Sequence, residues 1–595
     1  IFKRIASDAR QLRFEGEMGV NDLPVYIRHD QMTEAARLRV RYLSAVSVMP
    51  EASRLVVSVN DQPLATIVLD STSEPGVAEI DIPPGLLQVG YNVVRFNIQQ
   101  RHRVDCSIEA ANELWTQIDL AGTGLALLST NDQFSTVDDL IGFPEGEDGA
   151  TAITVVLAPG ADLAAIDQSL RAVQALTIRA DIQKPKVRFS RSAPTAPGIH
   201  LYVGARGVLR SLGVDGNSIS ESNLVVAGRS SSIARVFVTG DSAEEVATTI
   251  TRLSSEGRGA EKRGTTAGLR ALAYQRGAAI GPENEIALSA FGLSTQDFSG
   301  RTFRTSFNLV LPPDFYPADN GKAVLFLDGE YAAGLLTSNE AIVRVNGKIV
   351  GASRLTRSGG ETVNRRAIEI TLRALQPGHN RVTLEVRTAT DADRDCNPLS
   401  LIDSRRRLTI QSTTSFVLPR IARAEFLPNL GAATTTAYPY ALATQVTLFM
   451  PKADTAALGA AATLLARTAV ASGRPVTVRT SLRAPDEKTG SALVVGAFSD
   501  IPEPLFRQFA IRGDVIPANW KTTGQRRGPT PALVSEAPQG RPVRTAALPA
   551  RTVTDASPAP SPAAPTPEAP AEIHWIDRTL AATSRFRQRN IGYSA

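Results

Sequence analysis

Cysteine and histidine are scarce in this sequence. Its 595 residues include two cysteines and five histidines, and neither cysteine lies in a C-x-x-C or Cys/His ligand spacing. Structural zinc sites are built from such clusters, so none is indicated. No serine stands in a G-x-S-x-G elbow, which is the usual sequence sign of an acyl-transfer nucleophile. The sequence therefore lacks the commonest signs of metal and nucleophilic chemistry.

The chain also has little net charge and few aromatic residues. The 64 basic and 59 acidic side chains leave a formal charge of +5 spread along the chain, and aromatic residues make up 6%. A protein that follows nucleic-acid phosphates normally has a concentrated basic face with interleaved aromatics. We therefore expect no nucleic-acid partner.

Long apolar runs are missing as well. No stretch approaches the roughly 18 to 20 uninterrupted apolar residues of a membrane span, and Ile1 begins without the features of a signal peptide. Because the first residue is not methionine, we expect a processed or trimmed N-terminus, with a signal peptide or anchor outside the sequence.

The residues that are present indicate several strand-rich domains. A chain of this length corresponds to about three to five domains, and its 44 glycines and 37 prolines are typical of turn-rich structure. Runs of period-two alternation at residues 38–42, 55–59 and 93–98 predict strands, with no long helical period between them. Residues 1–150 are therefore predicted to form a β-sandwich domain.

Residues 151–280 change to an α/β pattern. The apolar run 153–157 predicts a buried strand, and Asp162 is predicted to cap the helix that follows. A small doubly wound sheet would be completed by strands at 186–189, 200–203, 224–226 and 235–238 and a helix at 241–253. The turn before Asp162 lacks a glycine-rich phosphate cradle, and an acidic N-cap repels phosphate. We therefore expect no bound flavin or dinucleotide.

The strand-rich pattern of residues 1–150 and the α/β pattern of residues 151–280 both return about 290 residues later. The matched segments, in order, are Val57–Asp61 with Val343–Gly347, Leu87–Asn92 with Leu375–Asn380, Asp105-Cys106 with Asp395-Cys396, and Pro159–Asp162 with Pro451–Asp454. Matches in one order at nearly constant spacing indicate a duplication. Residues 281–425 are predicted to form a second β-sandwich and residues 426–525 a partial second α/β domain, with strands at 446–450, 475–479 and 491–495 and a helix at 455–470.

The end of the chain has a different composition. Residues 526–572 are rich in proline and alanine and too poor in large apolar residues to fold, so a disordered tract is predicted. Residues 573–595 are predicted to form an amphipathic segment that could rejoin the last α/β domain. Arg585 and Arg589 have the R-x-x-x-R spacing that can grip cyclic di-GMP. In a chain this rich in arginine, an exposed helical face is the favoured interpretation.

Five residues of the first sandwich are candidates for binding sugar. Trp115 could stack on a pyranose ring beside the hydrogen-bonding side chains of Glu113 and Gln117, or it could close the sandwich core, which is the favoured interpretation. Arg101 and His102 lie in a polar segment, for which a solvated loop is favoured over a general base.

Acidic residues give no clear catalytic pattern. The D-x-D run Asp391–Asp395 is interpreted as a turn rather than as a metal site, because short acidic side chains favour turns. A hydrolytic pair of carboxylates far apart in sequence would not be visible, so a glycan-active enzyme stays an alternative.

Several segments resemble the B-type accessory subunit of bacterial cellulose synthase. In the first copy they are Val46–Leu55, Gln99–Cys106 and Glu113–Asp119, and in the second copy Leu309–Tyr316 and Leu327–Leu335. The resemblance runs from about Leu12 to Gly496. It implies two jelly-roll, carbohydrate-binding-like sandwiches that alternate with two flavodoxin-like domains without flavin, the last of them interrupted by the disordered Pro/Ala-rich tract.

The resemblance also implies a function. It predicts a non-catalytic periplasmic subunit without a cofactor, whose partners are the membrane-embedded cellulose synthase catalytic subunit and nascent cellulose. It further implies inner-membrane attachment through a C-terminal anchor that this chain lacks, and self-association is an additional expectation. The family is often labelled cyclic di-GMP-binding, and we expect that nucleotide on the cytoplasmic part of the catalytic partner. Cys106 and Cys396 are compatible with one disulfide or with two thiols.

Overall fold

The computed structural model describes most of the chain up to residue 508. The described residues are 2–4, 11–32, 36–104, 109–127, 134–146, 148–219, 222–230, 232–256, 263–312, 314–317, 321–394, 405–423, 430–440, 443–486 and 489–508. The predictions for residues 526–572 and 573–595, including Arg585 and Arg589, and for the pair Cys106 and Cys396 fall outside these ranges and stay predictions.

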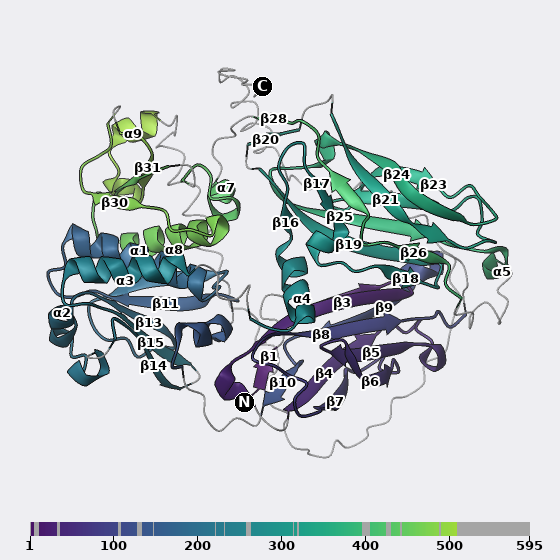
Figure 1. The fold of residues 1–595 in the computed structure, drawn as a ribbon, viewed down its shortest axis with the longest axis horizontal. Helices are drawn as coiled ribbons and strands as arrows, with labels where there is room; N and C mark the ends of the chain where they lie inside the picture. The colour runs from purple at the N-terminus through teal and green to yellow at the C-terminus, as the bar shows by residue number, and fades with distance from the viewer. Residues whose placement is uncertain are drawn as a thin grey trace, which may run out of the picture. The chain divides into compact units, whose positions relative to one another are not determined.

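The first sandwich consists of two antiparallel sheets (Figure 1). Its strands are β1 (Phe2–Arg4), β2 (Gln11–Glu15), β3 (Met18–Ile27), β4 (Ala36–Ser44), β5 (Arg54–Val59), β6 (Gln62–Val68), β7 (Gly76–Ile82), β8 (Gly90–Gln99), β9 (Trp115–Asp119) and β10 (Gly124–Leu127). One sheet has the order β1-β10-β4-β9-β2 with β7 on β4, and the other β3-β8-β5-β6. Leu38 of β4 and Phe96 of β8 are fully buried in one core. The strands predicted at 38–42, 55–59 and 93–98 are confirmed.

The second sandwich repeats this order strand for strand. Its strands are β16 (Ala278–Ala279), β17 (Glu285–Ala287), β18 (Gln296–Phe298), β19 (Thr302–Leu311), β21 (Lys322–Tyr331), β22 (Glu340–Val345), β23 (Lys348–Arg354), β24 (Glu361–Thr371), β25 (Gly378–Arg387), β26 (Leu408–Ile410) and β27 (Ser415–Val417). The orders are β17-β27-β21-β26-β18 with β24 on β21, and β16-β19-β25-β22-β23. Only β16 has no counterpart among the described strands of the first sandwich. A separate two-stranded antiparallel sheet is formed by β20 (Phe315–Tyr316) and β28 (Ala422–Arg423).

Equivalent asparagines make the same contacts in both sandwiches. Asn92 is buried and accepts from the Gln88 amide N–H at 2.9 Å, and Asn60 donates to its side-chain oxygen at 2.8 Å. Asn380 is buried in the same way. Its side-chain oxygen accepts one hydrogen bond from the Gln376 amide N–H at 3.0 Å and another from the side-chain amide of Asn346 at 3.0 Å. A repeated side-chain network of this kind supports the predicted duplication.

The first α/β region lies between the sandwiches in sequence. Its elements are β11 (Thr151–Val156), α1 (Leu163–Arg179), β12 (Pro185–Ser190), β13 (Gly198–Val203), α2 (Arg206–Ser211), β14 (Leu224–Ser230), β15 (Ile233–Val238) and α3 (Ala243–Ser255). Asp162 accepts from the Ala165 amide at 2.8 Å, so the predicted N-cap is confirmed. The sheet order is β12-β11-β13-β15-β14, and the edge strand β14 is antiparallel to β15. A doubly wound sheet would make it parallel, but the short connection between the two strands allows only a hairpin.

The second α/β region repeats the opening of the first. It contains α7 (Leu430–Thr435), β29 (Val446–Phe449), α8 (Thr455–Ser472), β30 (Val478–Ser481) and β31 (Ala492–Val494), in the sheet order β30-β29-β31. Asp454 caps α8 through the Ala457 amide at 2.8 Å, as Asp162 caps α1. β30 begins at Val478 rather than at residue 475, because Val476 bonds through its backbone to the side chain of Gln174 in α1.

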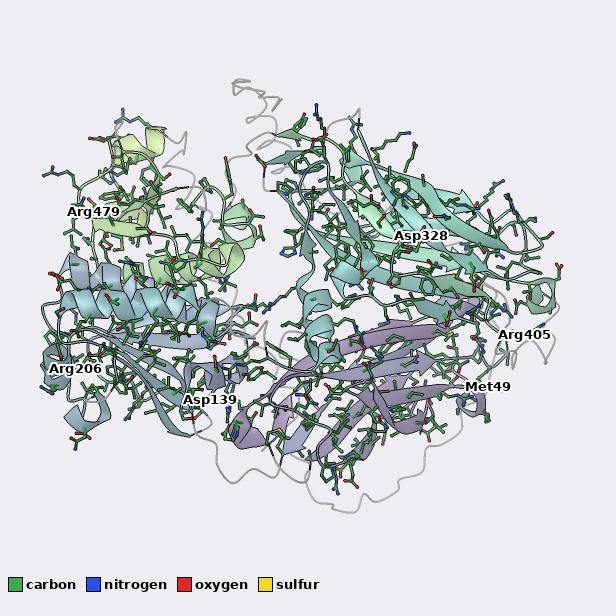
Figure 2. All side chains as sticks on the ribbon, in the orientation of Figure 1. Met49, Asp139, Arg206, Asp328, Arg405 and Arg479 are labelled. Atoms are coloured by element: carbon green, nitrogen blue, oxygen red, sulfur yellow. The ribbon has the colours of Figure 1, made fainter. Side chains whose placement is uncertain are left out.

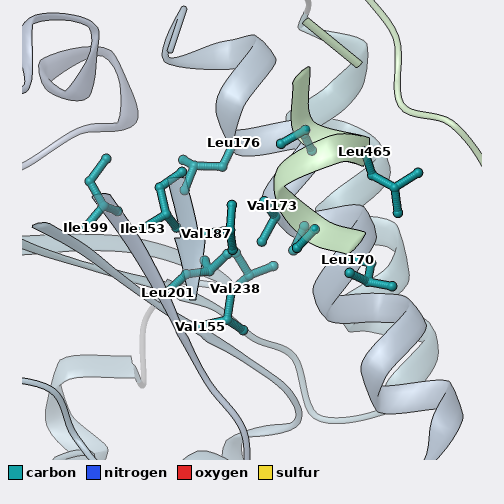
Figure 3. Packing of buried hydrophobic residues seen from close by; sticks show 14 of the residues in the cluster. Ile153, Val155, Leu170, Val173, Leu176, Val187, Ile199, Leu201, Val238 and Leu465 are labelled. Atoms are coloured by element: carbon teal, nitrogen blue, oxygen red, sulfur yellow. The ribbon is translucent and has the colours of Figure 1, made fainter. Parts of the chain in front are cut away.

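The two α/β regions share one apolar core (Figure 3). The cluster includes Leu170, Val173 and Leu176 of α1 together with Leu465 of α8. Thr463 of α8 also accepts from the Val187 amide on the edge strand β12 at 3.0 Å. The second region is therefore fused to the first through α1, α8 and β12.

The helix α8 is long and apolar enough to cross a membrane by length and composition alone. Its 18 residues have a mean hydropathy of 1.2, and half of that window is buried. Gly459 lies close to β12, where an added Cβ would come within 3.0 Å of the Val187 carbonyl oxygen. These contacts identify α8 as a core helix of the α/β region.

Two further helices complete the description. The helix α4 (Thr266–Arg276) contacts β3 and β8 of the first sandwich, and the Thr265 amide that precedes it donates to the Tyr91 carbonyl at 2.8 Å. The sequence-based division places this segment within the α/β domain at residues 151–280. The last described element is the helix α9 (Glu503–Gln508).

Candidate functional site

The first-copy segments that carry the sequence resemblance meet at one end of the first sandwich. The Met49 amide donates to the Arg101 carbonyl at 2.8 Å, and the Arg103 amide donates to the Ser47 carbonyl at 3.0 Å. The Ser47 hydroxyl donates to the Glu113 carbonyl at 2.9 Å. Figure 2 labels Met49 at this end. We call this group of segments, residues 45–53, 100–104 and 113–117, the loop cluster.

Trp115 combines features of a core residue and of a surface platform. It opens β9, its indole is half-buried, and it packs against the sandwich core. The Arg13 guanidinium carbon lies over the ring, 4.5 Å from its centre, and this arginine is exposed. One ring face is therefore covered by a side chain that solvent reaches and that can move aside.

Glu113 and Gln117 lie on either side of Trp115 in sequence. Glu113 ends a short 3₁₀ helix (Glu109–Glu113), and its side chain is 68% exposed. Gln117 is half-buried on β9, where it pairs with Arg13 of β2. Both residues carry hydrogen-bonding side chains and lie two positions from Trp115 in sequence.

His102 is not in a solvated loop, so that prediction was wrong. It is 8% exposed, and its backbone forms a bridge with Val48. Its Nδ1 accepts from the Val104 amide at 3.3 Å, which leaves Nε2 as the donor to Glu113 Oε2 at 3.2 Å. His102 therefore orients the exposed carboxylate of Glu113.

Arg101 is directed inward from the loop cluster. It is 5% exposed, and its guanidinium lies 3.2 Å from the fully buried carboxylate of Glu17. Burial lowers the pKa of Arg101, and the Glu17 carboxylate opposes that shift. Its position suits holding the backbone of the loop cluster rather than touching a ligand at the surface.

Two exposed valines add apolar surface to the loop cluster. Val46 is 71% exposed and Val104 is 88% exposed. They belong to the same loop cluster as the indole of Trp115 and the exposed carboxylate of Glu113. This combination can hold the apolar face and the hydroxyl groups of a sugar ring.

The acidic run at residue 391 forms a helical turn rather than an open turn. It makes the short helix α5 (Asp391–Arg394). Asp393 accepts from the Thr390 amide and hydroxyl at 2.8 Å each and pairs with Arg407 at 2.6 Å. These bonds lower the pKa of Asp393 against the opposing effect of its burial. Within the described ranges no group of three His, Cys, Asp or Glu side chains could hold a metal ion.

The structure also brings together charged residues that the sequence did not single out. Glu17 accepts from the Arg301 amide and guanidinium of the second sandwich at 2.6 Å each. The charge of Arg407 also lowers the pKa of Arg101, and the charge of Asp393 raises it. A buried glutamate has no sequence signature of its own, since its burial depends on a residue 284 positions away.

Comparisons with known proteins agree with the resemblance in this part of the chain. Residues 2–131 match the family model described as "Cellulose synthase BcsB, first CBM domain". A curated relative from Xanthomonas axonopodis pv. citri, named "Cyclic di-GMP-binding protein", is 28% identical over 122 residues, which are 20% of this chain and 15% of the relative. The matched part of the family model is a carbohydrate-binding domain and the relative is named as a binding protein, in agreement with the prediction of a non-catalytic subunit.

Solved structures give only partial likenesses. The C-terminal domain of EclA, a sugar-binding protein, has a TM-score of 0.13 at 11% identity and covers 20% of this chain and 76% of its own. A catalytic domain with two CBM51 domains from Clostridium perfringens ZmpB has a TM-score of 0.16 at 8% identity, over 69% of this chain and 34% of its own. TM-scores this low assign neither fold nor function, so the assignment depends on the sequence matches. Residues 2–131 are similar to the first carbohydrate-binding domain of the cellulose synthase BcsB family, so the resemblance to this accessory subunit of bacterial cellulose synthase is confirmed over that part of the chain.

Proposed function

We propose that this chain is a non-catalytic periplasmic subunit of bacterial cellulose synthase. In this role it supports the membrane-embedded catalytic subunit and guides nascent β-1,4-glucan across the periplasm. The observation that carries the proposal is the match of residues 2–131 to the first carbohydrate-binding domain of that subunit. The repeated strand order extends the same kind of sandwich to the second copy.

The loop cluster supplies a contact surface for the glucan. It presents an indole, an exposed carboxylate and two exposed valines, and no metal-ligand group accompanies them among the described residues. Such a surface holds a neutral sugar weakly, as a guiding surface must if the polymer is to slide.

The proposal includes the domain order that the resemblance implies. The two sandwiches are taken as jelly-roll domains and the two α/β regions as flavodoxin-like domains without flavin. Inner-membrane association and self-association belong to the same proposal. The match covers 15% of the curated relative, so these whole-protein properties are proposals for this chain.

Co-purification tests the proposal directly. We expect the affinity-tagged chain, when it is purified from its native membranes, to bring with it a processive glucosyltransferase. Mass spectrometry identifies that partner. Deletion of the chain should abolish cellulose output, and the purified chain should release no sugar from cellulose. Measurable glucan hydrolysis by the purified chain would instead support the glycan-active enzyme.

A cyclic di-GMP receptor is the second candidate, because the curated relative carries that name. Calorimetry with micromolar cyclic di-GMP separates the two. We expect no heat of binding, whereas saturable binding with a stoichiometry of about one or two nucleotides would favour the receptor.

A further inference from the structure

The two sandwiches differ at the centre of one outer sheet face. Leu38 of β4 and Leu325 of β21 are equivalent, since both are fully buried and each pairs with a buried residue of the equivalent neighbouring strand. The next residue along each strand faces outward. It is the exposed Arg39 in the first copy and the half-buried Phe326 in the second.

A β-bulge lies beside Phe326. Between the pairs Leu327–Arg366 and Gly329–Val363, one residue of β21 faces two residues of β24, which shifts the register. The equivalent pair of β4 and β7 keeps an unbroken register. Bulges re-aim side chains and are common next to binding sites.

The bulge places Arg365 over the ring of Phe326. Arg365 has a φ of +46°, a left-handed conformation that is costly for a residue other than glycine. Its amide donates to Asp328 Oδ1 at 2.6 Å, and Asp328 is labelled in Figure 2. Its guanidinium carbon lies 4.1 Å from the centre of the Phe326 ring.

A carboxylate fixes the same guanidinium from the side. Glu285 of β17 accepts from Arg365 Nη1 at 2.7 Å and Nη2 at 3.3 Å. The Ser415 hydroxyl donates to the same carboxylate at 2.5 Å. Arg365 and Glu285 are nevertheless 49% and 42% exposed, so their remaining donors and lone pairs face solvent.

The charges of this face select the class of ligand. Arg365 is neutralised by Glu285, and Asp328 adds a further negative charge next to it. Two further carboxylates, those of Glu330 and Asp297, both pair with one arginine, Arg406, which leaves an excess of negative charge in that group. Phosphate or uronate groups would be repelled, whereas a neutral polyol could use the paired donors and acceptors.

We propose that Phe326, Arg365, Glu285, Asp328 and Ser415 form a neutral-glycan subsite on the second sandwich that the first sandwich lacks. The subsite rests on the proposed function and specifies where an emerging glucan touches the second copy. A pyranose ring would lie against the stacked Arg365 and Phe326 side chains, and its vicinal hydroxyls would bond to Arg365, Glu285 and Asp328.

Calorimetry of the 595-residue chain with cellohexaose tests the subsite. We expect Arg365→Gly to weaken binding at least about fivefold, the size of one lost polar or stacking contact. Glycine adopts the φ of +46° without strain, so the melting temperature of this variant should not fall. Phe326→Leu keeps an apolar side chain and should weaken binding to a similar degree.

Arg39→Ala, at the equivalent position of the first copy, is the matched control and should leave affinity unchanged. Equal affinity of the wild type and both subsite variants would overturn the subsite, as would absence of cellohexaose binding by the wild type. Equally tight binding of an oligogalacturonate of the same length would overturn the neutral class. Co-purification with the glucosyltransferase is scored separately, so failure of the subsite is distinguishable from failure of the proposed function.

Discussion

Glu17 of the first sandwich accepts two hydrogen bonds of 2.6 Å from Arg301 of the second. The glutamate is fully buried, and Arg101 lies 3.2 Å from the same carboxylate. Its removal would take a shared carboxylate away from two buried arginines. The loop cluster and the second sandwich are thus joined by one carboxylate.

We expect Glu17→Ala to lower the free energy of unfolding by about 3–5 kcal/mol, because breaking a buried ion pair leaves an uncompensated charge. Urea unfolding followed by circular dichroism measures the loss. The control is Glu15→Ala, whose carboxylate also pairs with an arginine but is 60% exposed, and it should cost less than about 1 kcal/mol. Equal losses for the two variants would contradict the structural role of Glu17.

The repeated asparagines give a second prediction. Asn92→Ala and Asn380→Ala should each lower the unfolding free energy by about 1–3 kcal/mol, because each buried amide ties together the backbone of its own turn. Differential scanning calorimetry of both variants checks whether the losses agree. Gln88→Ala is the control, since Gln88 bonds to Asn92 through its backbone, which the substitution keeps. A large loss in one copy only would mean that the two networks are not equivalent.

The duplication could be predicted because it depends on local sequence. The turn at Asn60 returns at Asn346, and the N-cap Asp162 returns at Asp454, and each is determined by residues close by in the chain. Strands with clear alternation, such as β4, were predictable for the same reason. The strand β14 was predicted at residues 224–226, but its antiparallel direction was missed because the apolar run alone does not give strand direction.

The candidate site was less predictable. Trp115 and Glu113 were identified because their residue types suit sugar, but the burial of His102 depends on a bridge to Val48, which is distant in sequence. The Phe326 face was missed entirely, because it requires a bulge and a glutamate 80 positions from Arg365. Contacts of this kind are set by sheet register, which a single sequence does not reveal.

His200 gives the chain a predicted sensitivity to acid. It is 1% exposed on β13, its Nε2 donates to the Ala196 carbonyl at 2.8 Å, and burial together with the charge of Arg235 lowers its pKa. In the unfolded chain the imidazole therefore takes up a proton near pH 6.5, whereas in the folded chain it does so only at lower pH. The free energy of unfolding therefore falls as the pH drops below about 6.5.

We expect His200→Gln to reduce the difference between the melting temperatures at about pH 7.5 and pH 5.5, since glutamine does not titrate. The exposed His379 provides the control, and His379→Gln should retain the wild-type difference. An unchanged pH difference in His200→Gln would show that other groups cause it.

Glu113 offers the cleanest test of the loop cluster. Its side chain is 68% exposed, so Glu113→Ala should lower the melting temperature only slightly, by the loss of the hydrogen bond from His102. If its carboxylate binds glucan hydroxyls, affinity for immobilised cellulose should fall about two- to fivefold, the range of one exposed hydrogen bond. The matched control is Glu51→Ala, an exposed glutamate of the 3₁₀ helix Pro50–Ala52 in the same cluster. Because both variants remove one negative charge, an equal gain or loss of affinity would indicate a general charge effect, and only a loss specific to Glu113 would place the glucan beside Trp115.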